Sequence, residues 1–511
     1  MNFDPIRHIA VILTLIIMSL SFSYEPADAV LLDEDISLSN ADGSFIGEYA
    51  GAGLGTLIAF AGDVNGDGYD DILMSSDGYD TAPSGGTDVG KVYLIFGNAS
   101  SNIKDMDVAN ANATFLGEGQ WNYAGRALDG AGDLNGDGFD DIIISAARGP
   151  GKTYVIFGRR TGWSMNMNLV HSNASFIGEG TSDQSYRGLS GVGDVNNDGY
   201  DDFVIGATWN SAGGNVAGQA YLILGRSSGW SNNVSLANVN ASFIGEEAGD
   251  LAGNCVSGGG DINGDGYDDI IIGAYQNDEG GGNAGKVYII YGRSSGWSMD
   301  VDLSSANASF IGPTNTGQGK AMSMAGDING DGYDDILISS DQDSGGGLGL
   351  GRAYLAFGGS NLGHNVSLYN ANASFVGQMF DHLGSFIAGA GDLNGDGYDD
   401  FMVAATDNNG GGSSRGKVHV IYGKSSGWTM NASATNSDGA SFVGEADYDK
   451  IGSVAGEGDV NNDRRLDILI GTTINDEGGT NAGQVYLILN EPNSPPTITT
   501  IDDTSASEDE E

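Results

Sequence analysis

The sequence predicts an all-β fold, a seven-bladed β-propeller of four-stranded blades. An Asp-x-Asn-x-Asp element occurs seven times, and the six intervals between Asp63 and Asp459 average 66 residues. Glycine supplies 86 of the 511 residues, which is typical of short strands joined by frequent turns, and no long segment has helical periodicity. A four-stranded unit cannot bury both of its faces alone. Radial stacking of seven units buries them, whereas a linear solenoid, the alternative, would need unusually large coils.

Composition excludes several other classes of protein. With only 8 prolines the chain is not collagen-like, and with 40% hydrophobic residues it is not generally disordered. The net charge of −49 would be repelled by phosphate backbones, so no nucleic-acid partner is expected. Cys255 is the single cysteine, which excludes a disulfide framework within the chain.

Residues 1–29 are predicted to be a signal peptide. Arg7 precedes an apolar run over residues 9–20, and residues 27–29 (Ala-Asp-Ala) have the small side chains of a cleavage site. Such a run is too short to cross a hydrocarbon core of about 30 Å; a membrane anchor or a buried strand is the alternative. We therefore expect a secreted or cell-surface protein, with no membrane span elsewhere in the chain.

The order of the motifs predicts how the ring closes. A Ser/Thr-Phe-aliphatic-Gly motif precedes every Asp element, but no copy follows the last predicted strand, residues 484–489. The N-terminal segment 36–47 is thus one strand ahead of its blade. We expect it to pair with residues 484–489, which joins the two chain ends and removes exposed sheet edges. The phenylalanines of the motif are Phe45, Phe115, Phe176, Phe243, Phe310, Phe375 and Phe442.

The propeller domain is accordingly predicted to cover residues 30–490. Residues 491–511 are predicted to be a linker, because they begin with a proline cluster and end in an acidic tail. A strand-like Thr-Ile-Thr-Thr-Ile lies between these two parts, at residues 497–501. We expect this segment to lead into a further domain.

Each Asp element has the donors of a calcium loop. In the first loop, side-chain oxygens occupy positions 1, 3, 5 and 9, and position 7 can offer a backbone carbonyl. Gly68 at position 6 allows the sharp turn that points these groups inward. Six to eight oxygen ligands suit Ca²⁺ better than Mg²⁺, and the lack of His and Cys argues against zinc or copper.

Position 12 distinguishes this loop from the helical calcium loop, which needs a bidentate Glu there. All seven loops have an apolar residue at position 12, so we expect each loop to join two strands and to close on the Asp at position 9. A metal-free Asx-rich turn is the alternative, although its three carboxylates would repel one another. Up to seven Ca²⁺ ions are therefore the predicted cofactors. The predicted ligands are Asp63, Asn65, Asp67, Tyr69, Asp71, Asp133, Asn135, Asp137, Phe139, Asp141, Asp194, Asn196, Asp198, Tyr200, Asp202, Asp261, Asn263, Asp265, Tyr267, Asp269, Asp327, Asn329, Asp331, Tyr333, Asp335, Asp392, Asn394, Asp396, Tyr398, Asp400, Asp459, Asn461, Asp463, Arg465 and Asp467.

The seventh loop departs from the others. It keeps the ligand types but has Arg464 at the glycine position, next to Arg465. We expect a strained or altered turn with two cationic side chains beside it. Occupancy of this loop by calcium stays open.

The repeat resembles the FG-GAP repeat, most clearly in the Val-Gly-Asp-Val-Asn-Asn-Asp-Gly-Tyr-Asp-Asp-Phe-Val-Ile-Gly-Ala-Thr run of residues 192–208. That repeat builds the seven-bladed head of integrin α subunits and recurs in prokaryotic surface proteins. The resemblance implies calcium in the loop between the first two strands of each blade. The chain departs from the family at the "GAP" site, which becomes Ser-Ser-Asp at residues 75–77, and no inserted domain interrupts the repeats.

These observations predict a calcium-binding adhesion or ligand-binding module in which the metals are structural. Its partner would be an extracellular protein or a glycan, and the resemblance implies that this partner docks on the face opposite the Asp loops. A passive surface-layer or spacer component and a propeller-scaffold, polysaccharide-active enzyme are the alternatives. No catalytic residues are predicted, because the nucleophile-elbow pattern at residues 412–416 has no evident histidine partner. Secretion also allows a glycoprotein, with sequons at Asn98, Asn112, Asn173, Asn233, Asn240, Asn307, Asn365, Asn372 and Asn431.

Overall fold

The computed structural model describes residues 35–80, 87–100, 103–343, 349–409, 412–436 and 439–490. The predicted signal peptide and the predicted linker both lie outside these residues. No helix in this described part is long and apolar enough to cross a membrane.

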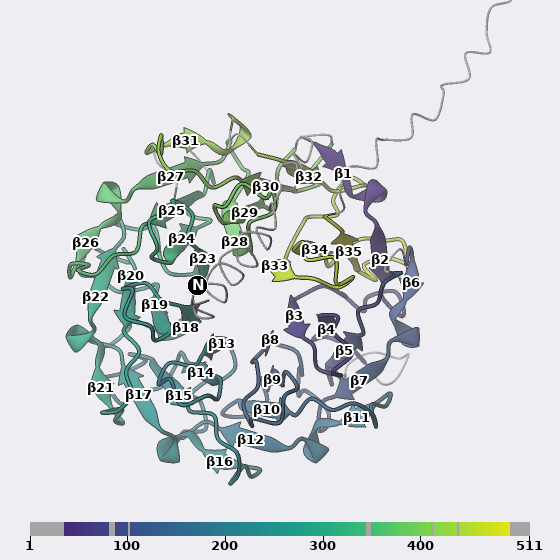
Figure 1. Ribbon diagram of the computed structural model, residues 1–511, viewed down its shortest axis with the longest axis horizontal. Helices are drawn as coiled ribbons and strands as arrows, with labels where there is room; N and C mark the ends of the chain where they lie inside the picture. The colour runs from purple at the N-terminus through teal and green to yellow at the C-terminus, as the bar shows by residue number, and fades with distance from the viewer. Residues whose placement is uncertain are drawn as a thin grey trace, which may run out of the picture.

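The described residues form seven β-sheets arranged around a central opening, which confirms the predicted seven-bladed propeller (Figure 1). Each sheet has five strands rather than the predicted four. Three consecutive antiparallel strands form the inner part of a blade, and the next sequence unit supplies the fourth. A two-residue segment pairs in parallel with the fourth strand; it comes from farther along the chain in the first five blades and from the N-terminal part of the chain in the last two. The sequence does not predict this fifth strand, because two residues have no measurable periodicity.

In each blade the first strand lies nearest the axis and the fifth lies at the outer rim. The first blade contains β3 (Ile58–Gly62), β4 (Asp71–Ser76), β5 (Lys91–Ile95), β7 (Ala113–Leu116) and β11 (Met167–Asn168). The second contains β8 (Leu128–Gly130), β9 (Ile142–Ala146), β10 (Lys152–Ile156), β12 (Ala174–Ile177) and β16 (Val234–Ser235). The third contains β13 (Leu189–Gly193), β14 (Asp202–Ala207), β15 (Gln219–Ile223), β17 (Ala241–Ile244) and β21 (Val301–Asp302). The fourth contains β18 (Ala252–Gly260), β19 (Asp269–Ala274), β20 (Lys286–Ile290), β22 (Ala308–Ile311) and β26 (Val366–Ser367).

The remaining three blades follow the same plan. The fifth contains β23 (Ala321–Gly326), β24 (Asp335–Ser340), β25 (Arg352–Ala356), β27 (Ala373–Val376) and β31 (Ala432–Ser433). The sixth contains β28 (Leu383–Gly391), β29 (Asp400–Ala405), β30 (Lys417–Ile421), β32 (Ser441–Val443) and β1 (Ile36–Ser37). The seventh contains β33 (Val454–Gly458), β34 (Asp467–Thr472), β35 (Gln484–Ile488), β2 (Gly43–Ile46) and β6 (Met106–Asp107).

Short 3-10 turns link neighbouring blades at the outer rim. Each follows the fifth strand of one blade and precedes the fourth strand of the next, so each turn connects two adjacent sheets. In η2, for example, the Asp107 carboxylate accepts the Ala109 N–H at 2.8 Å, and Val108 is fully buried. The turns are η1 (Leu38–Asn40), η2 (Val108–Asn110), η3 (Leu169–His171), η4 (Leu236–Asn238), η5 (Leu303–Ser305), η6 (Leu368–Asn370) and η7 (Ala434–Asn436).

The N-terminal segment closes the ring. Strand β2 pairs antiparallel with β35, with Phe45 opposite Val485, so β2 is the fourth strand of the last blade. Strand β1 pairs in parallel with β32, with Ile36 opposite Phe442. This confirms the predicted closure and extends it, because the segment contacts two blades rather than one.

Each pair of neighbouring blades shares a hydrophobic core. Between the first two blades, Val92 and Leu94 of β5 pack with Ile142 and Ile144 of β9, and Phe115 of β7 joins them. All five side chains are fully buried. The blades therefore bury one another's faces, which is why a single unit could not fold alone.

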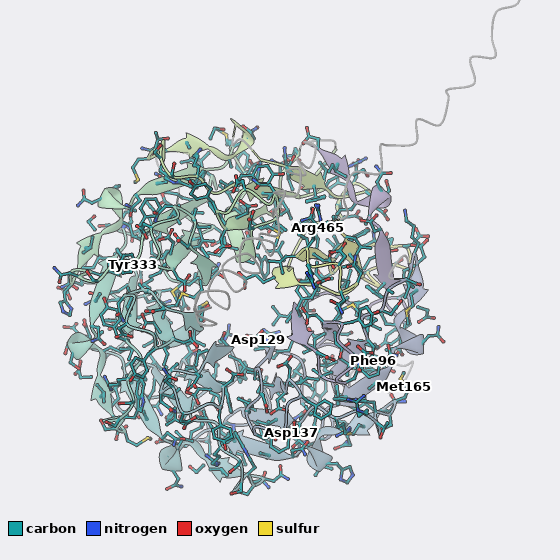
Figure 2. All side chains as sticks on the ribbon, viewed as in Figure 1. Phe96, Asp129, Asp137, Met165, Tyr333 and Arg465 are labelled. Atoms are coloured by element: carbon teal, nitrogen blue, oxygen red, sulfur yellow. The ribbon has the colours of Figure 1, made fainter. Side chains whose placement is uncertain are left out.

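The first strands of the blades line a central channel with a volume of 480 Å³. Six of the seven blades place Ala or Ser at one level of this channel, but the second blade places Asp129 there, beside the opening in Figure 2. Its carboxylate accepts the Ser190 hydroxyl and the Gly191 N–H, both at 3.1 Å. Burial raises the pKa of Asp129 to about 7.

Asp129→Ser, which introduces the serine that three other blades have at this level, is expected to stabilise the protein at pH 8 and to stabilise it less at pH 5. The folded-state pKa of about 7 lies above the ordinary value of 3.8, so the free energy of unfolding falls as the pH rises through this window. Thermal melts at the two pH values measure the difference. Ser257→Ala, at the same level of the channel, should give no pH-dependent change. Equal effects of Asp129→Ser at both pH values would contradict this account.

Five of the sequon asparagines have a structural role. In each, the side-chain oxygen accepts the N–H of the residue that follows the third strand, as Asn112 does for Phe96 at 2.9 Å. The turn that the motif needs therefore accounts for these residues, and glycosylation remains a prediction. The five are Asn112, Asn173, Asn240, Asn307 and Asn372.

Candidate metal centre

The seven Asp loops join the first and second strands of their blades. In the first blade β3 ends at Gly62 and β4 begins at Asp71, so the loop spans eight residues between two antiparallel strands. All seven loops consequently lie on one face of the ring, and the connections between second and third strands lie on the other. Figure 2 labels Asp137, Tyr333 and Arg465, which belong to three different loops.

The first Asp of each loop holds the turn together. The Asp63 carboxylate accepts the N–H groups of Gly66 at 2.7 Å, Asp67 at 2.9 Å and Gly68 at 2.8 Å. Gly68 has a φ of +92°, a region that glycine adopts without strain. The exposed Asp67 accepts the N–H of Tyr69 at 3.2 Å. The position-1 and position-5 aspartates of the other six loops make the corresponding contacts to positions 5, 6 and 7.

The Asp at position 9 lies beneath the loop. Asp71 is fully buried, and it accepts the Gly97 N–H at 3.0 Å and the Asn65 amide at 3.3 Å. Burial, with smaller contributions from the charges of Asp67 and Asp63, raises its pKa to about 8. Its six counterparts are equally buried, with pKa values raised to about 7 or 8: Asp141, Asp202, Asp269, Asp335, Asp400 and Asp467.

The loops bring oxygen donors close together without converging on one point. Within the described ranges, no group of three or more Asp, Glu, His or Cys side chains is arranged to hold a metal ion. Asp63 faces the amides of its own turn, and Asp71 faces Gly97. The donor chemistry nevertheless suits Ca²⁺, because the loop offers only oxygen and keeps a buried carboxylate beside two others whose charges a divalent cation would neutralise.

Comparison with known proteins identifies the repeat. The model of the FG-GAP repeat matches six segments of the chain, at residues 54–95, 124–156, 189–223, 253–290, 323–355 and 384–421. Each segment contains one Asp loop and the strands on either side of it. The chain is an FG-GAP repeat protein. The seventh loop lies outside the matched residues.

Integrin α subunits are among the relatives of this FG-GAP propeller. Integrin alpha pat-2 of Caenorhabditis briggsae is 32% identical over 196 residues, which are 36% of this chain and 15% of the relative. Integrin alpha-PS2 of Drosophila melanogaster is 29% identical over 34% of this chain and 12% of the relative. Integrin alpha-8 of Gallus gallus is 30% identical over 45% of this chain and 20% of the relative. The chain thus spans a fifth or less of the length of these relatives.

The seventh loop of the FG-GAP propeller keeps its turn despite the missing glycine. Arg464 has a φ of +71°, and its N–H donates to the Asp459 carboxylate at 2.7 Å, as Gly68 does to Asp63 in the first loop. A side chain in this backbone region is strained, as the sequence predicts.

The Asp at position 8 has a function that the sequence did not predict. Its carboxylate accepts the N–H of the first Asp in the preceding blade, so Asp140 binds the Asp63 N–H at 2.7 Å. Six such hydrogen bonds connect the Asp loops of neighbouring blades. In the seventh blade Leu466 occupies position 8, so this bond is not made there. The Asp-Asp pair at positions 8 and 9 of six loops was the feature of the sequence that could have indicated this function. The residues are Asp70, Asp140, Asp201, Asp268, Asp334 and Asp399.

The aromatic residue at position 7 also connects neighbouring loops. A Cβ on Gly66, at position 4 of the first loop, would lie 2.4 Å from the Phe139 ring of the second. Tyr200 and Tyr333 cover Gly136 and Gly264 in the same way. The predicted role of position 7 was a backbone carbonyl ligand; the structure adds that its side chain packs between blades.

Proposed function

We propose that this chain is a secreted or cell-surface FG-GAP propeller that binds Ca²⁺ structurally and binds an extracellular protein or glycan, without catalysis. Its relationship to integrin α subunits supports an adhesion or ligand-binding module. The calcium would sit in the Asp loops, which already connect adjacent blades through the position-8 carboxylates. Ca²⁺ ions in the Asp loops would stabilise the ring, and the opposite face would remain accessible to the partner.

One observation favours that opposite face as the docking surface. Four of the large exposed aromatic side chains lie in its connections: Trp121 is 50% exposed, Trp209 46%, Phe380 50% and Tyr448 63%. Three of them, Trp121, Phe380 and Tyr448, also have φ values between +60° and +72°. Strained backbone that displays an aromatic ring to solvent is typical of binding sites, where aromatic residues contribute most of the affinity.

A binding screen with surface variants tests this proposal. The purified chain is screened in Ca²⁺ against glycans and extracellular proteins, and each hit is remeasured with Trp209→Ala, Phe380→Ala and Tyr448→Ala. We expect at least one substitution to weaken binding about 30-fold, the loss of a residue worth about 2 kcal/mol.

Tyr369→Ala is the matched control, because Tyr369 is 65% exposed but lies in η6 at the outer rim. It should leave the affinity unchanged. The absence of any ligand would instead favour a passive surface-layer or spacer role. Turnover of a polysaccharide would contradict the proposed absence of catalysis.

A further inference from the structure

We infer that the seventh blade contains a binding site for a primary ammonium group, between the side chains of Glu445 and Glu477. The inference names a ligand chemistry for the face on which the proposed function rests. The ammonium could belong to a lysine of a partner or to a free amine. The fourth blade is the template for this site, because it contains the same arrangement with the lysine of the chain itself as the cation.

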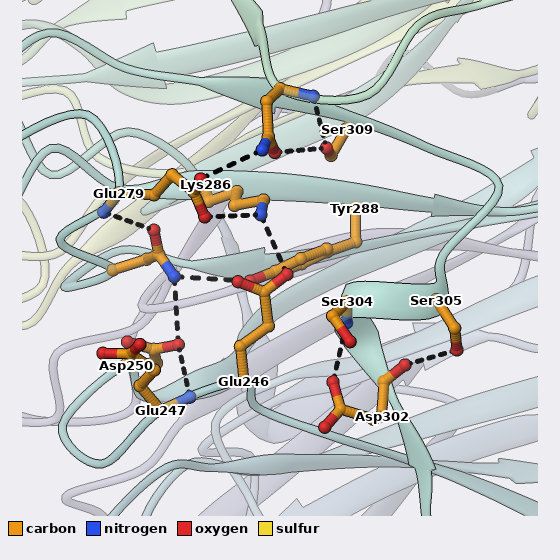
Figure 3. Close-up of polar contacts among 12 residues, drawn as sticks. Glu246, Glu247, Asp250, Glu279, Lys286, Tyr288, Asp302, Ser304, Ser305 and Ser309 are labelled. Carbon is orange, nitrogen blue, oxygen red and sulfur yellow. Dashed lines mark hydrogen bonds and ion pairs between the residues drawn. The ribbon is translucent and has the colours of Figure 1, made fainter.

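In the fourth blade, Lys286 lies between two glutamates (Figure 3). Its Nζ is 2.8 Å from Glu246 and 3.4 Å from Glu279, and it lies 5.0 Å from the centre of the Tyr288 ring. Lys286 is only 3% exposed, so its charge depends on these partners. The site therefore consists of two carboxylates and one aromatic face around an ammonium group.

Other blades keep a cation at this position. At the start of the third strand, Lys91, Lys152 and Arg352 lie over Tyr93, Tyr154 and Tyr354, at 4.9, 4.9 and 5.6 Å from the ring centres. Lys91 also pairs with Glu48, and Lys152 with Glu118, the counterparts of Glu246. An ammonium or guanidinium over this tyrosine is thus a repeated feature of the fold.

The seventh blade keeps the acceptors but lacks the cation. Glu445, Glu477 and Tyr486 correspond to Glu246, Glu279 and Tyr288, whereas Gln484 stands in place of Lys286. Gln484 is 2% exposed, and its side-chain oxygen has no hydrogen-bond partner in the described part of the chain. It lines a cavity of 230 Å³ together with both glutamates and Tyr486. An unpaired buried acceptor costs free energy, so a hydrogen-bond donor bound beside it and the two carboxylates would be stabilised.

A second replacement makes this cavity more acidic. In the fourth blade the Asn365 amide donates to Glu279 at 3.1 Å. The corresponding residue of the seventh blade is Asp105, which lines the same cavity and cannot donate when ionised. Lys104 also lines the cavity, but it is exposed, and no ion pair within 4 Å is found for it among the described residues. The ammonium of the template is therefore replaced by a neutral amide, and its Asn365 amide by a carboxylate.

The chemistry of the cavity favours an ammonium over a metal ion. Among the described residues, the three acids that line it are not arranged as a metal-binding group. The face of the Tyr486 ring attracts an organic cation, and hydrogen bonds of about 2.8 Å, as in the template, suit N–H donors.

A neighbouring cavity offers a path for a lysine side chain. It has a volume of 350 Å³ and shares Glu445 and Glu477 with the smaller cavity. Asp447, Asp476 and the exposed ring of Tyr448 line it as well. An incoming lysine could lay its methylene groups on Tyr448 while its ammonium reaches the two glutamates.

The third blade shows that Gln alone does not create the site. Gln219 also replaces the lysine, and its side-chain oxygen also lacks a partner among the described residues, but its amide donates to Asp300 at 3.0 Å. The position of Glu279 is occupied there by Ala212. Only the seventh blade, among the described residues, combines both glutamates with the loss of the cation.

Titration of the full chain in saturating Ca²⁺ with Nα-acetyl-lysine methylamide tests the inference, with calorimetry and ligand-observed NMR as readouts. We expect one saturable site. Free n-butylamine should bind too if the ammonium alone suffices, whereas binding of the lysine amide alone would identify a peptide lysine as the source. The Nε-acetylated lysine amide should not bind.

Three variants supply the controls. Gln484→Lys should abolish binding by providing the missing ammonium, and its melting temperature reports that it folds. Glu477→Gln, a change at an exposed position, should weaken binding at least tenfold. Lys286→Gln should open the equivalent site in the fourth blade and raise the stoichiometry from one to two.

Several outcomes would overturn the inference. They are no saturable binding by the unmodified chain, unchanged binding by a folded Gln484→Lys variant, and binding that appears only after Lys104→Ala, since Lys104 would then be the resident cation. Because calcium is saturating throughout, such a failure leaves the calcium proposal and the partner screen unaffected.

Discussion

Chelation of calcium is expected to lower the melting temperature of the propeller by roughly 10–20 °C. At a free calcium concentration one hundred times its Kd, each site would contribute about 2.7 kcal/mol to the free energy of unfolding. The Asp loops connect neighbouring blades through the position-8 carboxylates, so the loss of several ions weakens the whole ring at once. Calorimetry of the protein in Ca²⁺ and in chelator measures the shift.

Single-site variants show whether the ions occupy the predicted loops. Asp71→Asn should reduce the number of bound ions by one, as counted by native mass spectrometry, and should lower the melting temperature by a fraction of the chelation effect. Asp476→Asn, outside the Asp loops, is the control and should change neither quantity. An unchanged melting temperature in chelator, or equal protection by Mg²⁺, would refute the calcium proposal.

Deletion of residues 35–47 is expected to open the ring. The deletion removes β2, the partner of β35, and β1, the partner of β32, so the last blade loses its fourth strand. Its third strand becomes an exposed edge that invites association with other chains. We expect rapid hydrogen exchange along β35, a lower melting temperature, and dimers or aggregates on size-exclusion chromatography. Adding the deleted segment as a synthetic peptide should restore protection of β35.

Two matched substitutions separate closure from packing. Phe45→Ala in β2 and Phe115→Ala in β7 each remove a fully buried ring from the same blade position and should each cost about 3–5 kcal/mol. Only Phe45→Ala should also increase exchange along its partner strand, because β2 is held near the end of the chain. If the deletion leaves β35 protected, the described pairing does not close the ring in solution.

Much of the fold could be predicted because the repeat is long and strongly marked. Seven Asp loops and seven phenylalanines specify the number of blades, and the missing motif after residues 484–489 predicts which segment closes the ring. The fifth strands could not be predicted, because two-residue segments such as β11 are defined only by their pairing with another blade. Their residues look like ordinary loop sequence.

The candidate sites show the same division. Local spacing alone assigns oxygen donors to the Asp loops, because all of the donors lie within nine residues of one another. The hydrogen bond from the Asp63 N–H to Asp140 spans 77 residues, and local patterns carry no information about that contact. Likewise, the sequence does not show that Gln484, which replaces a lysine, lines a cavity together with Glu445 and Glu477.

The sequence by itself determined the repeat, the strand order within a blade, the direction of closure and the chemistry of the loops, because each follows from the order and spacing of motifs along the chain. Only the tertiary structure decided which loops touch, which face displays aromatic rings and which buried acceptors lack a donor. Those properties depend on the radial packing of blades, which places residues far apart in sequence within hydrogen-bonding distance.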